Sequence, residues 1–75
     1  MAEDPKQKPL AGLTGHRLAI AHLLMAGYLE VQISEQLFLS LSSVKKYVVD
    51  LKERLEVQSL HGLSAKLMRL YLEQQ

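Results

Sequence analysis

Between Leu13 and Leu72, apolar residues recur mostly every three or four positions, which is the period of α-helices. A β-strand would need apolar residues at every second position, and no stretch of the chain alternates strictly enough. The 75 residues include no cysteine, so neither disulfide bonds nor thiolate-bound zinc can stabilise the fold. A chain of this length builds a single hydrophobic core. We therefore predict one small all-α domain that depends on apolar packing.

Capping residues divide the periodic region into four predicted helices. Thr14 can cap the first helix with its hydroxyl, and Gly27 suits the left-handed conformation that often ends a helix. Ser40 and Ser59 offer hydroxyls at the starts of two later helices. Residues 1–12 are charged, contain both prolines, and are predicted to form a flexible arm. The predicted domain covers residues 13–75, with helices over 15–26, 29–37, 41–55 and 59–73.

Charge and composition argue against several classes of function. Nine Lys and Arg against eight Asp and Glu give a net charge of +1, which by itself points to no partner. No apolar run approaches the ~18 residues that a membrane span needs, and the first twelve residues do not resemble a secretory signal. His16, His22 and His61 lack metal-ligand spacing and are predicted to lie at the surface. We expect a cytoplasmic protein that is not an enzyme and holds no metal or cofactor.

Two of the predicted helices, 29–37 and 41–55, are joined by only three residues. A short link between a supporting helix and a capped amphipathic helix is typical of the helix-turn-helix, whose second helix enters the major groove of DNA. The apolar residues of the second helix share a narrow sector of the helical wheel, namely Val44, Val48, Leu51 and Leu55. Small helical bundles of other functions contain such pairs too, so the spacing alone leaves both interpretations open.

Residue identities extend this pattern along most of the chain. The run LFLSLSSVKKYV, from Leu37 to Val48, combines a turn, a cap and the start of an amphipathic helix. Further matches are Leu13, Thr14, Leu23, Leu24, Gly27, Ile33, Leu55, Val57 and Ser59. On these residues, Leu13 to Ser59 resembles the DNA-binding domain of LuxR-type (GerE-like) bacterial regulators. The resemblance implies a four-helix helix-turn-helix domain that binds double-stranded DNA, usually as a homodimer, and regulates transcription.

The resemblance makes the segment 41–55 the recognition helix. Ser43 stands where the family commonly has a phosphate-contacting Thr, and Lys45 where it has a DNA-contacting basic residue. Lys46 could reach phosphates or guanine edges, while Val49 offers an apolar surface to a thymine methyl group. The candidate DNA-binding residues are Ser42, Ser43, Lys45, Lys46, Val49 and Lys52.

An alternative interpretation of these charges remains open. Lys46 and Asp50 are four positions apart, as are Asp50 and Arg54. At this spacing, opposite charges on a helix can form intrahelical ion pairs on a solvated face, with no role in binding.

The chain departs from the family pattern in its first two helices. Gly15, His16 and Arg17 follow Thr14, where the family usually has charged residues that include a capping Glu. From Leu18 to Ala26 only His22 is polar, which suggests a second packing surface for a protein partner, unless its small alanines are simply tolerated. Glu30 opens the second helix near the place where the family commonly has a Lys or Arg, so fewer phosphate contacts are available.

With few usable cations, a monomer should bind DNA weakly, so we expect a homodimer. The last helix can supply the contact through Leu60, Ser64, Met68, Tyr71 and Leu72. In the alternative interpretation, the last three of these residues only close the monomer core. The competing functional hypothesis is a domain of the same fold that has lost DNA-binding charge and acts by binding another protein. An output domain separated from its regulatory portion is a third possibility.

Overall fold

The structure, a computed structural model, describes residue 10 and residues 12–74. This part of the chain contains four helices. They are α1 (Gly15–Met25), α2 (Glu30–Leu37), α3 (Leu41–Arg54) and α4 (Leu60–Gln74). Each predicted boundary lies within one residue of the observed one, and the all-α fold is confirmed. None of the helices in this part of the chain has the length and apolar character that a membrane span requires.

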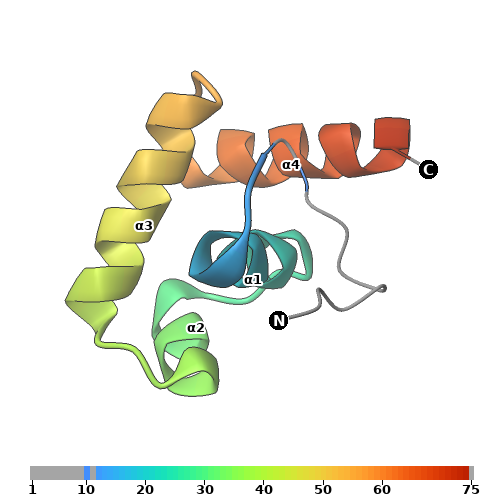
Figure 1. Cartoon of the computed structure of the whole chain (residues 1–75). Coiled ribbons are helices and arrows are strands. Elements are labelled where there is room, and N and C mark those ends of the chain that lie inside the picture. Colours follow the sequence, from blue (N-terminus) through green and yellow to red (C-terminus); the bar gives the residue numbers. More distant parts are fainter. Residues whose placement is uncertain (1–9, 11, 75) are drawn as a thin grey trace.

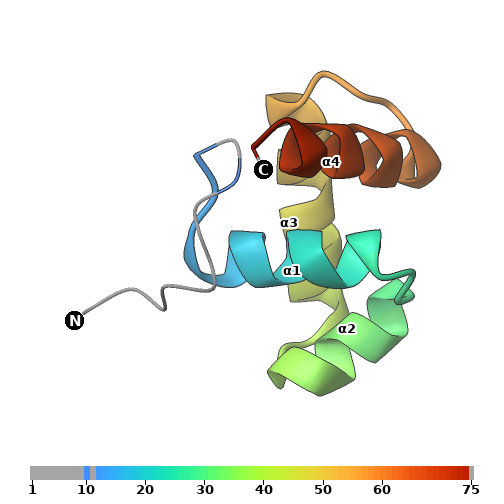
Figure 2. The same ribbon diagram turned by 90° about the vertical axis from the view of Figure 1, so that its right-hand side faces the viewer.

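The helix α3 holds the other three together. It contacts α1, α2 and α4, and α1 also packs against α4. Figure 1 shows α3 as an upright helix at one edge of the molecule. In Figure 2, α4 and α2 lie on opposite sides of α1, and α3 runs behind them at a steep angle. This arrangement places one side of α3 inside the molecule and leaves its other side at the periphery.

One apolar core joins the four helices. Its buried members are Leu10, Leu13, Leu18, Ile20, Ala21, Leu24, Ile33, Val44, Val48, Leu51, Leu55, Leu63 and Leu67. The central position of α1 explains its composition, because α3 and α4 both pack against it and four of its residues are buried. Leu23 and Met25 are partly buried against the same core. The apolar residues of α1 are thus covered within the monomer, and they do not form the exposed partner surface that the sequence suggested.

Most helix ends follow the predicted capping. The Ser40 hydroxyl accepts a hydrogen bond from the Ser43 backbone N–H at 3.1 Å, and the Ser59 hydroxyl accepts one from the Gly62 N–H at 2.9 Å. Gly27 follows α1 at a φ of 93°, the left-handed conformation expected of it. These three residues therefore act as the sequence predicted.

The predicted Thr14 cap is wrong. Its side chain makes no capping hydrogen bond, although its backbone is extended as a cap requires. The next residue, Gly15, has a φ of 60°, so the first turn is not regularly helical. The N–H groups that a capping hydroxyl would normally meet are consequently displaced from Thr14.

The turn between α2 and α3 depends on a left-handed residue that is not glycine. Phe38 has a φ of 56°, a conformation that costs free energy for a residue with a side chain. Its side chain is 94% exposed, so no packing contact compensates for this cost. Phe38 nevertheless turns the chain so that Leu39 packs on the core and Ser40 caps α3.

Leu10 belongs to the domain, although the sequence placed it in the arm. It is 1% exposed, and its carbonyl accepts a hydrogen bond from the Leu13 N–H at 2.8 Å. Residues 1–9 and 11 of the predicted arm lie outside the described residues, as does Gln75, the last residue of the predicted domain.

Replacing Leu10 by Ala should destabilise the protein by about 2–5 kcal/mol, because the substitution leaves a cavity in a closed core. Urea denaturation followed by circular dichroism measures this change. Leu29→Ala is the matched control, since Leu29 is 64% exposed and its loss should cost less than about 0.5 kcal/mol. Equal unfolding midpoints for the two variants would show that Leu10 does not contribute to the core.

Candidate nucleic-acid interface

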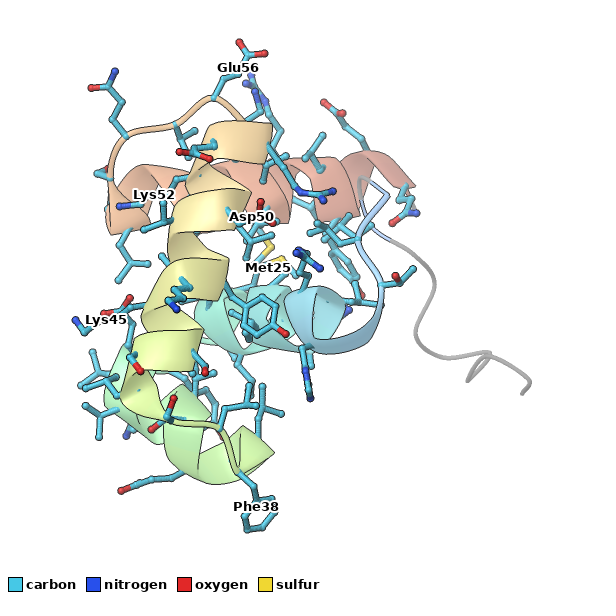
Figure 3. All side chains as sticks on the ribbon, turned by 60° about the vertical axis from the view of Figure 1, so that its left-hand side comes forward. Met25, Phe38, Lys45, Asp50, Lys52 and Glu56 are labelled. Atoms are coloured by element: carbon cyan, nitrogen blue, oxygen red, sulfur yellow. The ribbon has the colours of Figure 1, made fainter. Side chains whose placement is uncertain are left out.

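The candidate DNA-binding residues lie on the parts of α3 that the core leaves uncovered. Val44, Val48 and Leu51 are buried, which orients the helix. The exposed candidates are Ser42, Lys45, Lys46 and Val49, and the half-buried ones are Ser43 and Lys52. Lys45 and Lys52 project from one edge of α3, and Asp50 projects from the other (Figure 3). The middle of the uncovered face is a ridge formed by Ser42, Lys46, Val49 and Glu53, which helical spacing places in line.

One edge of α3 is partly neutralised by α2. The Lys45 Nζ lies 3.4 Å from Glu30 Oε1, and the two side chains are 59% and 24% exposed. The pair adds little stability because it is open to solvent, so it does not hold Lys45 tightly. Lys45, with most of its side chain exposed, therefore remains accessible to a ligand. Glu30 nevertheless places a negative charge where a phosphate would approach Lys45. The sequence showed that Glu30 stands near the place where the family commonly has a cation. It could not predict the contact with Lys45, which depends on how α2 packs against α3.

The opposite edge of α3 is joined to α1 through Asp50. Its Oδ2 accepts hydrogen bonds from Arg17 Nε at 2.7 Å and from Arg54 Nε at 3.0 Å. The intrahelical pair between Asp50 and Arg54 therefore forms, as the alternative interpretation of the charges required. Lys46 does not join it, and within residues 10 and 12–74 no ion pair involves the Lys46 ammonium group. Lys46 is thus a free cation at the centre of the ridge.

Arg17 is the residue at this site that sequence reasoning missed. Its guanidinium lies over the Tyr47 ring, 5.3 Å from the centroid. The same ring packs edge-on against His16, with centroids 5.9 Å apart, and the Tyr47 hydroxyl lies 3.4 Å from His16 Nδ1. These contacts join the start of α1 to the middle of α3. The sequence already showed that Arg17 departs from the family pattern, which has charged residues that include a capping Glu at the start of this helix. It did not show which residue of α3 Arg17 would contact.

These contacts shift the acidity of both members of the central pair. The hydrogen bond from Arg17 is the main reason that the pKa of Asp50 lies below its ordinary value of 3.8. The same bond raises the pKa of Arg17. At neutral pH, Asp50 is therefore a carboxylate held between two guanidinium groups.

A shallow cavity of about 320 Å³ opens beside this pair. It lies between the start of α1 and the edge of α3, and its lining residues are Arg17, Ser43, Lys46, Tyr47 and Asp50. Two predicted DNA-binding residues, Ser43 and Lys46, thus share a concave surface with Arg17. In the described part of the chain, no three His, Asp or Glu side chains are grouped as metal ligands would be.

The predicted dimer residues of α4 divide into two groups. Leu60 packs against the core, and the Ser64 hydroxyl donates to the Leu24 carbonyl at 3.4 Å, so these two face the monomer interior. Met68 and Leu72 are 40% and 61% exposed, whereas Tyr71 is 37% exposed and packs its ring against α1. Exposed residues on the same side of α4 follow the 4-3-4 spacing of a helix-packing stripe: His61, Ala65, Met68 and Leu72. We call this set the α4 stripe.

His22 is not the surface residue that the sequence predicted. It is half-buried on α1, and its ring packs edge-on against Tyr71 of α4, with centroids 6.2 Å apart. Its Nε2 is enclosed and has no hydrogen-bond partner among the described residues. The packing of α4 over α1 accounts for this burial.

The family model of the bacterial regulatory proteins, luxR family (GerE), matches residues 11–66 of the chain. The matched range includes all of α1, α2 and α3 and the first part of α4. No curated protein and no solved structure matches the chain.

Asp50→Asn should make stability less sensitive to acid. Because the pKa of Asp50 is lowered in the folded state, its contribution is present above the ordinary value of 3.8 and is lost as the pH falls through the lower folded value. Thermal unfolding between about pH 6 and about pH 2 should therefore show a shallower acid decline in the variant. Glu53→Gln is the control, because it removes an exposed carboxylate of α3 that forms no ion pair with the described residues. Identical pH profiles for these two variants would contradict the lowered pKa of Asp50.

Proposed function

Because the chain belongs to the luxR family of bacterial regulatory proteins, we propose that it binds duplex DNA through α3 and regulates transcription. The observation that carries this proposal is the uncovered ridge of α3, where Lys46 and Val49 are exposed while Val44 and Val48 are buried on the opposite side. A regulator of bacterial genes works where the chromosome is, so we infer that this one is cytoplasmic.

The dimensions of α3 support its insertion into the major groove. The groove is about 12 Å wide, and a helix with its side chains is about 10–12 Å across. α3 lies at the edge of the molecule, so its ridge can approach DNA without a clash from the other helices (Figure 1). In this position Lys46 would meet a phosphate or a guanine edge, and Val49 a thymine methyl group.

The serine hydroxyls at the start of α3 suit contacts with phosphates. Ser40 Oγ donates to Ser43 Oγ at 2.9 Å and lies 3.2 Å from Ser42 Oγ, so the three hydroxyls form one cluster. Each hydroxyl can donate one hydrogen bond and accept two, so the outer members keep capacity for a phosphate oxygen. Ser43 therefore fits the phosphate contact that the family resemblance implies, and Ser42 suits a contact of the same kind.

Weak binding by one copy is the expected consequence of the surrounding carboxylates. Glu30 and Asp50 are paired with cations of α3, and Glu53 shares the ridge with Lys46. Affinity for DNA depends strongly on the number of phosphates neutralised. A two-fold dimer would double the number of contacts. It would also set two recognition helices about 34 Å apart, the length of one DNA turn.

The α4 stripe is the surface that we propose for this dimer. Met68 and Leu72 supply its apolar area, and Tyr71 lies at its margin. Pairing of two such stripes would bury apolar surface that the monomer exposes to water. Leu60 and Ser64 are no longer part of the proposed contact, because they face the monomer interior.

A second candidate function is binding of another protein through α2. Leu29, Val31 and Phe38 are 64%, 51% and 94% exposed, and Glu35 on the same helix is also exposed. An apolar and acidic surface does not suit DNA, but it suits a protein partner. If this second function is correct, substitutions at Val31 or Phe38 should abolish regulation of transcription in cells while binding to duplex DNA remains intact.

Lys45→Ala and Lys46→Ala test the proposed DNA contact. Each phosphate contact contributes about 0.9 to the slope of log K against log salt, so the double variant should lose up to about 1.8. Lys46→Ala should have the larger effect of the two single variants, since Lys45 is already paired with Glu30. Fluorescence anisotropy with random-sequence duplex at low and moderate salt measures these slopes. Lys66→Ala, an exposed cation on α4, is the control.

DNA binding through α3 fails as a proposal if the wild-type protein shows no salt-dependent binding to duplex. It also fails if the double variant keeps the wild-type slope.

Met68→Glu tests the α4 stripe. A buried charge at the centre of a dimer contact is costly, so the variant should sediment as a monomer at concentrations where the wild type is a dimer. Lys66→Ala again serves as the control, because it changes α4 outside the stripe. A wild-type protein that remains monomeric with and without DNA would remove the stripe from consideration, as would a variant that still dimerises.

A further inference from the structure

We propose that the cavity between α1 and α3 is a phosphate-binding site for the DNA strand that runs beside α3, with Arg17 as its principal ligand. This inference rests on the proposed function and identifies a contact outside the recognition helix. The cavity combines a guanidinium from α1 with an ammonium and a hydroxyl from α3, those of Lys46 and Ser43.

Arg17 is held in a conformation that leaves most of its hydrogen-bond donors available. The contact with Asp50 uses the Nε–H, whereas a guanidinium has five N–H donors in all. The Tyr47 ring lies 5.3 Å from the guanidinium carbon and supports one face of the group. The side chain is still 39% exposed. A planar fork that is fixed in place and open to solvent loses little conformational entropy when it binds a phosphate.

The charges around the cavity favour an anion. Its lining contains two cations, Arg17 and Lys46, and one carboxylate, Asp50. Asp50 is further neutralised by Arg54, whose Nε lies 3.0 Å from the same oxygen. Lys46 has no ion pair with any described residue, so its charge is available to a ligand. Arg17 and Lys46 can therefore bind a phosphate while Asp50 keeps Arg17 in position.

The position of the cavity identifies the source of the phosphate. A helix in the major groove has one phosphate backbone along each of its edges. The cavity lies along the Asp50 edge of α3 and shares Ser43 and Lys46 with the proposed DNA-binding surface. On the other edge, Glu30 lies next to Lys45 and would repel a phosphate. The backbone on the Arg17 side should therefore make the stronger contact, which offsets the acidic start of α2.

Arg17→Gln tests this site directly. The variant should lower the salt slope of duplex binding by about 0.9, as the loss of one phosphate contact requires. Lys66→Gln is the matched control, because it also removes one exposed cation but lies on α4 and does not line the cavity, and its slope should not change. Arg17→Lys should recover the slope but only part of the affinity, since an ammonium keeps the charge and loses the fork. Thermal unfolding of all three variants verifies that the domain is intact.

The outcomes separate this inference from the proposed function. A wild-type protein that binds duplex, together with an Arg17→Gln variant of unchanged slope and affinity, would overturn the phosphate site and leave DNA binding through α3 in place. A wild-type protein that does not bind duplex would overturn both. Inorganic phosphate, titrated while the Ser43 and Tyr47 amide signals are observed by NMR, should cause only weak and unsaturated shifts. Saturation by inorganic phosphate, with or without duplex, would make the cavity a site for a small anion and contradict our assignment.

Discussion

The packing of α3 against the other three helices determines how every proposed contact is presented. Val44, Val48 and Leu51 are at most 3% exposed, and burying such side chains stabilises a protein by roughly 1.5–3 kcal/mol each. Turning α3 about its axis would expose these residues and bury Lys46. The core therefore orients α3, and its outward ridge follows from what is buried behind it.

Ion pairs at the two edges of α3 then adjust a surface that apolar packing has already oriented. The Asp50 edge gains Arg17, a cation from another helix, and the Lys45 edge gains a carboxylate, Glu30. Both contacts are solvent-accessible and so contribute little to folding. Their effect is on the electrostatic field at the surface of α3, which makes its two edges unequal. The two edges of α3 thus differ in their charges, although the net charge of the chain is only +1.

The apolar residues of α1 and α4 show where sequence patterns are ambiguous. Both helices carry more apolar residues than a single core-facing stripe needs. In α1 the surplus is covered by α3 and α4 of the same chain, whereas in α4 Met68 and Leu72 remain exposed. For the same reason the sequence predicts Leu60 and Ser64 in the dimer contact, because they lie next to the stripe on the helical wheel, whereas in the structure they face inward. Periodicity locates an apolar face, but only the neighbouring helices determine how much of that face they cover.

The amino-acid sequence was sufficient for the helices and most of their ends, because these depend on interactions within about four residues. The serine caps at Ser40 and Ser59 and the turn at Gly27 are of this kind. Contacts such as that between Arg17 and Asp50 join residues 33 positions apart, and they exist only because α1 and α3 cross where both side chains can reach. The burial of Leu10 likewise depends on elements distant in the chain. Local chemistry therefore determined the helices, and the angles at which they pack decided which charges meet and which surfaces stay open.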